Sequence, residues 1–390
     1  MTTPLAGLKV LDAGLLVQGP QAAALLHDWG ADVIKVELPG FGDQARWLPV
    51  EPGETRSAFF TACNRGKRSA TVDLRVAAGR DVFLKLVESA DVVISNFAPG
   101  TMEGWGLAYE DVAAVNPRIV YAVGSTFGYR GPDAAREGAD LAAQAAGGLI
   151  AGTGREGDDV TPMAVTITDH IASLNMVAGI LAALMVRDRT GRGQRVETSL
   201  LGGQIWAQAS EYTGHLLTGK PHGRANRGHP RIPGVYAIFA TADGWIAIVG
   251  VVGPKRDTFY ELIGRPELKE RFPQVLYWDE EKVELFPLVD EAMRVRTTAE
   301  WLGILRAADI RCAPVRDVSA VVADEQVWAN EYLVDVDGTK VVASPVRFSE
   351  TPARVSATVP EVGQHTEEVL IELGRTWDDI ARLQAESVIP

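Results

Sequence analysis

Residues 8–37 read LKVLDAGLLVQGPQAAALLHDWGADVIKVE, and this stretch decides the fold. Leu8–Leu11 is a short apolar strand, Gln21–Trp29 is rich in Ala and Leu as helices are, and Val33–Glu37 is a second strand. The order predicts a β-α-β unit. Such a unit requires a parallel sheet covered by helices.

The same alternation continues downstream. A predicted helix at Val82–Val87 precedes a strand at Asp91–Ser95, and another strand at Ile119–Val123 follows an Asn-Pro turn. The strand-like segment Ala70–Leu74 precedes this helix. Repeated alternation predicts the α/β class, with a parallel sheet that carries helices on both faces.

The middle of the chain is predicted to contain two long helices. The first runs from about His170 to Arg189 and ends at Thr190-Gly191, a strand follows at Gln194–Leu200, and the second helix covers Leu201–Leu217. The first helix carries an apolar stripe at spacings of three and four: Ile171, Leu174, Val177, Leu181 and Leu184.

The length of 390 residues predicts two domains, because one hydrophobic core stops growing at roughly 250 to 300 residues. The polar residues 219–234 are the best linker candidate. Beyond them, Val235–Ala240 and Trp245–Val249 flank an Asp-Gly turn and predict a hairpin, as Val334–Val342 does again. The tail, 367–384, has helical spacing and is expected to fold back on the first domain.

Composition excludes several classes of protein. A net charge of −13 argues against non-specific nucleic-acid binding, although Arg65, Lys67 and Arg68 form a local basic cluster suited to an anionic ligand. Only two cysteines occur, which favours a reducing compartment, and no signal-like segment begins the chain, so a cytoplasmic location is expected. The apolar stretch 171–186 is shorter than the ~20 residues that cross a membrane, so no membrane association is expected.

Two segments resemble known functional motifs, a dinucleotide-binding fingerprint and a hydrolase nucleophile elbow, but both motifs are incomplete. Asp12–Gly19 lies between a strand and a helix, as a nicotinamide-binding fingerprint does, but Leu16 replaces the second glycine. Gly124–Gly128 lacks the Gly-x-Ser-x-Gly order of a hydrolase nucleophile elbow. A dehydrogenase and a serine hydrolase are therefore disfavoured.

The segment between the two predicted domains is rich in histidine. His215, His222 and His229 recur every seven residues without a cysteine or paired carboxylate at metal-ligand spacing, so no metal is expected. The segment could instead supply contacts to a bound acid, through Tyr212, the three histidines, Arg224 and Asn226.

A set of motifs in a fixed order spans nearly the whole chain. They are Asn64–Ser69, Asp91–Met102, Asn116–Tyr121, Ser125–Gly128, Asp169 before a long helix, Arg189–Gln194 and Gly363–Glu367. In this order and spacing they resemble the class III CoA-transferase (CaiB/BaiF) family, which also contains the α-methylacyl-CoA racemases.

The resemblance implies an architecture that periodicity does not reveal. A large Rossmann-like domain is expected from residues 1–200 and 330–390, a linker segment from 201–225, and a smaller α+β domain from 226–329. The resemblance also implies a homodimer whose subunits interlock like chain links, with an acyl-CoA and a carboxylic acid as substrates and coenzyme A as the group transferred.

Asp169 is the catalytic residue that the resemblance implies. A carboxylate that attacks a thioester carbonyl releases the CoA thiolate and retains the acyl group as a mixed anhydride. At the start of a helix the backbone dipole favours the ionised carboxylate by ~0.3 to 1 kcal/mol. Without the resemblance, the spacing alone favours an ordinary helix N-cap.

The resemblance also assigns a set of CoA contacts: Val17, Gln18, Asn64, Lys67, Arg68, Asn96, Phe97 and Ser125. Lys67 and Arg68 are expected to face the nucleotide phosphates, and Asn96 and Phe97 to follow a parallel strand at its ligand-binding end. The alternatives are a solvated basic turn for the first pair, a strand-end turn for the second, and apolar packing for Val17.

One position separates transferase from racemase. The racemases of this family use a histidine directly before an aspartate, and here that position is Ala139, so one of two acid/base groups is missing. A CoA-transferase is therefore preferred, with a racemase-like isomerase as the alternative. Leu38 replaces an arginine that contacts CoA in many relatives, and the lack of a glycine run near Gly250 and Gly253 disfavours oxalate as the acceptor.

Overall fold

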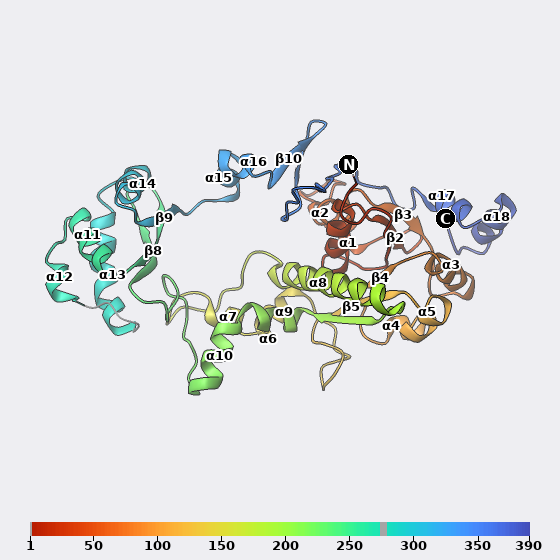
Figure 1. Ribbon diagram of the computed structural model, residues 1–390, viewed down its shortest axis with the longest axis horizontal. Coiled ribbons are helices and arrows are strands. Elements are labelled where there is room, and N and C mark those ends of the chain that lie inside the picture. The colour runs from red at the N-terminus through yellow and green to blue at the C-terminus, as the bar shows by residue number, and fades with distance from the viewer. Residues whose placement is uncertain (1, 274–278) are drawn as a thin grey trace. The chain divides into compact units, whose positions relative to one another are not determined.

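The computed structural model describes residues 2–273 and 279–390 (Figure 1). Residues 274–278, within the predicted smaller domain, lie outside the described part. The chain divides into two compact units. The first comprises Met1–Gly147, Met163–Ala207 and Glu325–Pro390, and the second comprises Gly148–Pro162 and Gln208–Asp324.

The first unit is built on a six-stranded sheet with the order β3-β2-β1-β4-β5-β6. All its strand pairs are parallel, which confirms the predicted parallel sheet. The strands are β1 (Lys9–Asp12), β2 (Asp32–Glu37), β3 (Arg68–Thr71), β4 (Val92–Ser95), β5 (Val120–Ser125) and β6 (Arg195–Ser199).

Helices cover both faces of this sheet. Successive side chains of a strand point to opposite faces, and apolar strand residues are buried on each face. Val10 and Ile94 pack in one core with helices α1 (Gln18–Asp28) and α8 (Ile167–Thr190). Leu11 and Val93 pack in the other core. The helices of that core are α3 (Ala77–Val87), α5 (Tyr109–Val115), α17 (Thr366–Glu372) and α18 (Trp377–Ala385).

The C-terminal tail belongs to the first unit, as the sequence predicts. The amide of Thr71 in β3 donates to Thr366 Oγ1 at 3.0 Å, and Figure 1 shows the blue C-terminal helices beside the N-terminal strands. The remaining elements of this unit are η1 (Gln44–Trp47), α2 (Ala58–Asn64), α4 (Thr101–Gly104), α6 (Asp140–Ala146), α9 (Leu200–Ala207), α16 (Glu325–Ala329), β10 (Leu333–Val336) and β11 (Thr339–Val342).

The second unit contains a three-stranded antiparallel sheet, β7-β8-β9, formed by Val235–Ala240, Trp245–Val251 and Arg311–Pro314. The predicted Asp-Gly hairpin is confirmed: Thr241 N–H donates to the carbonyl of Gly244 at 2.9 Å. The helices of this unit are α7 (Leu149–Gly152), α10 (Ala209–Thr218), α11 (Pro254–Leu262), α12 (Leu268–Arg271), α13 (Asp279–Met293), α14 (Thr298–Ala307) and α15 (Val318–Val322).

The boundaries differ from the predicted ones in two places. The expected helix over 201–217 is broken at Gln208, where the chain passes from the first unit to the second. Residues 148–162 join the second unit, because Ala225 N–H donates to the carbonyl of Gly152 at 2.8 Å. Local sequence patterns do not encode such contacts between distant segments.

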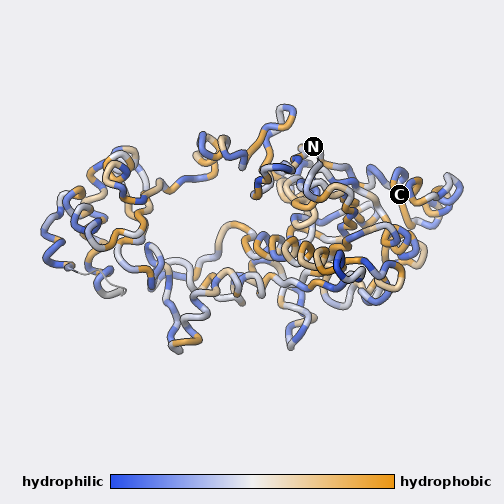
Figure 2. Tube along the Cα trace, in the orientation of Figure 1, coloured by the Kyte–Doolittle hydropathy of each residue, from blue (hydrophilic) through white to orange (hydrophobic). Residues whose placement is uncertain are grey.

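Helix α8 is long and apolar enough to cross a membrane by length and composition alone. Figure 2 shows its apolar residues in orange. Met176 and Ile180 on this helix are fully buried in the core that α8 forms with the sheet. These contacts are those of a core helix.

Candidate functional site

The strand order reverses direction between β1 and β4, and parallel α/β sheets bind ligands outside the carboxyl ends of such strands. The loops after these strands are joined by an amide pair. Leu15 N–H donates to Asn96 Oδ1 at 2.7 Å, and Asn96 Nδ2 donates to the Leu15 carbonyl at 2.9 Å. A pocket of about 280 Å³ opens beside them.

This pocket gathers five of the predicted site residues, Gln18, Asn96, Phe97, Ser125 and Asp169. Gln18 begins α1, Asn96 and Phe97 follow β4, Ser125 ends β5, and Asp169 lies in the first turn of α8. The other lining residues are Leu15, Leu16, Gln44, Ala98, Pro99, Thr126, Arg136, Glu137, Gly138, Ala139 and Leu200.

Asp169 is the third residue of α8, which has Thr166 as its N-cap. No residue of the described part donates a hydrogen bond to the Asp169 carboxylate, although its carbonyl accepts from Ser173 Oγ at 2.8 Å. A carboxylate that is half-buried and lines a pocket without a donor is available for chemistry. The N-cap alternative for Asp169 is therefore wrong.

The N-terminus of α8 is satisfied by Asp140, the first residue of α6. Asp140 Oδ1 accepts from Thr168 N–H at 2.7 Å, from Thr168 Oγ1 at 2.6 Å and from Asp169 N–H at 3.3 Å. Asp140 Oδ2 accepts from Gln144 Nε2. Asp140 thus performs the capping that the sequence pattern suggests for Asp169.

Burial, followed by the negative charge of Asp140, raises the pKa of the Asp169 carboxyl to about 7. The sequence predicts instead a carboxylate favoured in its ionised form by the helix dipole. Two effects of the fold outweigh the dipole: the pocket removes water from the charged group, and Asp140 already occupies the amides at the helix end. A raised pKa near working pH leaves the group basic and nucleophilic once it is ionised.

The kcat/KM of the enzyme is expected to fall at acidic pH, because the pKa of the Asp169 carboxyl is raised. Asp169 must be ionised to attack, so kcat/KM should fall about tenfold per unit as the pH drops below about 7, and level off above it. Initial rates between about pH 5 and 9 measure this limb. A limb centred near the ordinary aspartate pKa of ~4 would contradict the raised pKa.

Gln18 is fixed between the sheet and α8. Its carbonyl accepts from Ser173 Oγ at 2.7 Å, the same hydroxyl that contacts the Asp169 carbonyl. Its side-chain amide lies where a Cβ of residue 124 would be, so any larger residue in place of Gly124 in β5 would displace the Gln18 amide. Gln18 is therefore held at a defined position relative to Asp169.

Comparison with known proteins identifies the family. The model of CoA-transferase family III matches residues 5–366. The chain belongs to CoA-transferase family III. A succinate–glutarate CoA-transferase from Agrobacterium fabrum is 34% identical, covering 95% of this chain and 96% of its own length. The succinyl-CoA:glutarate CoA-transferase of Homo sapiens is 31% identical, covering 97% and 87% respectively.

A solved structure has the same fold. The CaiB/BaiF family protein from Brucella suis superposes with a TM-score of 0.87 and 32% identity, covering 96% of this chain and 100% of that chain. The chain is accordingly an enzyme of the CoA-transferase class, and CoA thioesters are the substrates of that class.

Four predicted CoA contacts of this CoA-transferase do not line the pocket. Val17 is 3% exposed, as the packing alternative has it, and Asn64 is fully buried. Lys67 is also buried, and its Nζ donates to Asp12, to the Pro20 carbonyl and to Asn64 at 2.6, 2.7 and 2.8 Å. With three acceptors inside the protein, Lys67 presents no free N–H to a phosphate.

Arg68 also differs from the expectation. Its guanidinium forms ion pairs with Asp32, Glu368 and Glu372 at 2.8 to 2.9 Å. These carboxylates join β3 to the C-terminal helix α17. The geometry therefore gives Arg68 a structural role. A basic cluster in sequence does not reveal which acids the fold places against it.

The pocket of the CoA-transferase also contains residues that the sequence did not select. Arg136, Glu137 and Gly138 lie in the loop after β5, and the carboxyl ends of parallel strands are the signal that could have found them. Ala139 lines the pocket without an acid/base group. His170 does not replace it, since its ring nitrogens contact Gln21 and Thr166.

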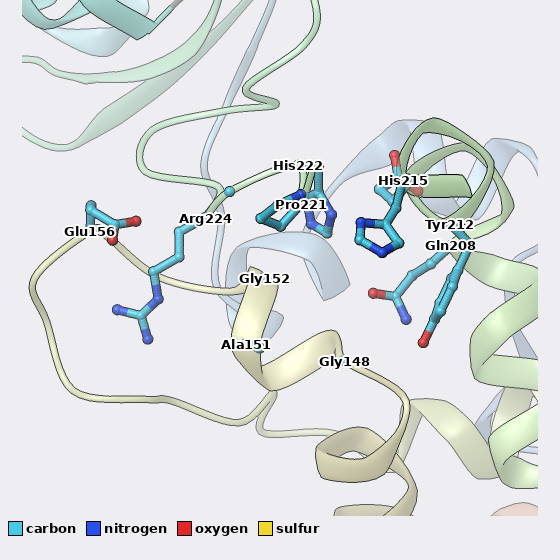
Figure 3. A pocket seen from close by; sticks show the side chains of 12 residues that line it. Gly148, Ala151, Gly152, Glu156, Gln208, Tyr212, His215, Pro221, His222 and Arg224 are labelled. Atoms are coloured by element: carbon cyan, nitrogen blue, oxygen red, sulfur yellow. The ribbon is translucent and has the colours of Figure 1, made fainter. Parts of the chain in front are cut away.

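The histidine-rich segment lies in the second unit and surrounds a separate pocket of about 290 Å³ (Figure 3). Tyr212, His215, His222 and Arg224 line it, as the sequence grouped them. Arg224 is held by the Arg155 and Asp158 carbonyls. The other two members of the group are engaged elsewhere: His229 contacts Glu211 at 2.8 Å, and Asn226 Oδ1 accepts from Glu156 N–H at 2.8 Å.

Proposed function

We propose that this enzyme moves CoA from an acyl-CoA thioester to a free carboxylic acid through covalent intermediates on Asp169. The observation that carries the proposal is the Asp169 carboxylate, which lines the switch-point pocket and receives no hydrogen bond from any residue of the described part. A carboxylate with a pKa of about 7 is a stronger nucleophile than an ordinary aspartate.

The reaction proceeds by exchange at carbonyl carbons. A carboxylate oxygen of Asp169 attacks the thioester carbonyl, the C–S bond breaks, and CoA leaves as the thiolate from an acyl-aspartyl anhydride. The thiolate then attacks the aspartyl carbonyl, which releases the donor acid and leaves CoA on Asp169 as a thioester. The acceptor carboxylate repeats the sequence in reverse, forms the new acyl-CoA and regenerates the Asp169 carboxylate.

The surroundings of Asp169 suit this chemistry. Asn96 Nδ2, the Ser125 hydroxyl and the Gln18 amide are polar groups from three different strand ends around the pocket. Such groups can orient an acyl carbonyl beside the nucleophile. The transfer needs no second acid/base group, which agrees with alanine at position 139, whereas α-proton exchange does.

The test is a trapped adduct combined with a substrate screen. Incubation with an acyl-CoA is expected to give an Asp169 adduct, seen by mass spectrometry of the intact chain and of its peptides, that hydroxylamine removes. Relatives named for succinate and glutarate make dicarboxylic acids the first acceptors to screen. Deuterium uptake into a 2-methylacyl-CoA without free acid, in the absence of any adduct, would favour an isomerase instead.

We also propose that the enzyme is a homodimer, as the family resemblance implies. The α8–α9 surface of the first unit supports this, because large apolar side chains are exposed there: Leu174, Met185, Ile205 and Trp206, the last at 74%. Exposed apolar surface of this kind is typical of subunit interfaces.

Replacing Trp206 with arginine is therefore expected to shift the protein from dimer toward monomer. A charged side chain inside an apolar interface lacks a partner, and such losses reach about 2 kcal/mol or more at an aromatic anchor. Light scattering after size-exclusion chromatography measures the change over a range of protein concentrations. As a control, Trp377→Arg replaces another exposed tryptophan, on α18. A wild-type protein that is monomeric at every concentration would reject the dimer.

A further inference from the structure

Leu16 has an unusual backbone conformation at the edge of the pocket. Its φ is 61°, in the left-handed region that glycine adopts readily and a leucine rarely does. A non-glycine residue there is strained and persists only when its surroundings hold it. Leu16 occupies the position at which the incomplete dinucleotide motif would have a glycine. Helix α1 begins two residues later, at Gln18.

Side chains accept hydrogen bonds from three consecutive backbone amides of this loop. Gly14 N–H donates to Asp12 Oδ1 at 2.9 Å, Leu15 N–H donates to Asn96 Oδ1, and Leu16 N–H donates to Asp43 Oδ1 at 3.0 Å. The bond to Asp43 reaches the strained residue itself.

Asp43 is fully buried and firmly held in its own right. Its Oδ1 also accepts from Ala45 N–H at 2.8 Å and so caps η1, while its Oδ2 pairs with Lys35 Nζ at 2.8 Å. Its amide donates to Glu37 Oε2 at 2.8 Å. Lys35 Nζ in turn contacts the Gly14 carbonyl. Asp43 and its partner Lys35 therefore both contact the loop, Asp43 at the Leu16 amide and Lys35 at the Gly14 carbonyl.

The loop conformation is transmitted to the nucleophile. Two residues after Leu16, the carbonyl of Gln18 accepts from Ser173 Oγ, and the same hydroxyl contacts the Asp169 carbonyl. A displacement of Leu16 therefore moves Gln18, which lines the pocket, relative to Asp169. Misplacement of a reacting group by about 1 Å can cost on the order of 10²-fold in rate.

We infer that Asp43 is a positioning residue of the transferase, which holds Leu16 in its left-handed conformation and thereby fixes Gln18 beside Asp169. Asp43 does not line the pocket, and the contact through which we take it to act is its bond to the Leu16 amide. The inference rests on the proposed function, since it takes Asp169 as the reacting group.

The test is a double-mutant cycle between positions 43 and 16. Asp43→Asn retains the size of the side chain but gives the Leu16 amide a neutral and therefore weaker acceptor, and it also loses the charge that pairs with Lys35. It is expected to lower kcat about 10- to 100-fold with a smaller change in KM. Leu16→Gly is the reference background of the cycle, because glycine adopts this φ without support, and its own rate is measured separately from the coupling. In the Leu16→Gly background, Asp43→Asn is expected to cost no more than about 3-fold.

A matched control is Asp12→Asn, which removes another fully buried carboxylate from the same lysine cluster but does not contact Leu16. Its cost should be the same with either residue at position 16. Equal costs of Asp43→Asn in both backgrounds, in variants that melt as folded proteins, would overturn the inference. The Asp169 adduct of the wild-type enzyme is measured alongside, so that failure of the nucleophile assignment is distinguished from failure of the coupling.

Discussion

Asp169→Ala is expected to lower kcat for CoA transfer by at least about 10³-fold and to abolish the hydroxylamine-sensitive adduct. The carboxylate forms the covalent bond that divides the transfer into steps, and the neighbouring carboxylate of Asp140 is occupied by the amides of α8 and by Gln144. Losses of nucleophiles in covalent enzymes are of this order or larger. Steady-state transfer rates and intact-protein mass spectra measure both effects.

The control for this variant lies on the same helix. Asp188→Ala removes an exposed aspartate near the other end of α8 and is expected to leave both rate and adduct unchanged. Asp169→Asn, which retains the size of the side chain, should be as inactive as the alanine variant. Full transfer by Asp169→Ala would exclude Asp169 as the nucleophile, whatever the fold.

The sequence predicts the large architecture well because the determining signals are local. Runs such as Ile119–Val123 are apolar over their whole length, and this pattern is typical of a strand buried on both faces. Their alternation with helices then restricts the sheet to parallel pairing. The switch point between β1 and β4 follows from strand order, which the sequence alone does not provide.

The site is predicted less completely because its decisive contacts join distant residues. Through the family resemblance the sequence selects Gln18, Asn96 and Ser125 together with Asp169, and the structure brings these four to one pocket. The sequence does not reveal that the ammonium group of Lys67 pairs with the carboxylate of Asp12, 55 residues earlier in the chain. Charge clusters in a sequence indicate only that partners are needed, and the fold determines which.

Asp140 is the clearest case of this limit. In the sequence it is only the residue after the missing histidine, at Ala139. In the structure it both caps α8 and raises the pKa of the Asp169 carboxyl, across 28 and 29 residues of chain. One buried carboxylate therefore stabilises the fold and, together with burial of Asp169, raises the pKa of its neighbour.

Asp140→Ala is expected to lower the free energy of unfolding by about 2 to 4 kcal/mol, since it leaves buried donors on Thr168 and Gln144 without their acceptor. The more conservative Asp140→Asn retains an acceptor oxygen for Thr168 and removes the charge. It is expected to move the acid limb of kcat/KM about half to one unit lower in pH, because a like charge beside Asp169 opposes ionisation. Chemical denaturation and pH-rate profiles measure the two effects separately.

Asp317→Ala provides the matched control, because Asp317 caps α15 by accepting from Ala320 N–H at 2.8 Å and is exposed in the second unit. Loss of that cap should cost about 1 kcal/mol and leave the pH profile in place. If Asp140→Asn lowered the rate at every pH without moving the limb, the charge of Asp140 would not set the ionisation of Asp169, and its role would be confined to holding α8. If instead the acid limb moves to lower pH while the maximal rate persists, the charge of Asp140 acts on the ionisation of Asp169. Loss of the helix cap would displace Asp169 and lower the rate at all pH values alike.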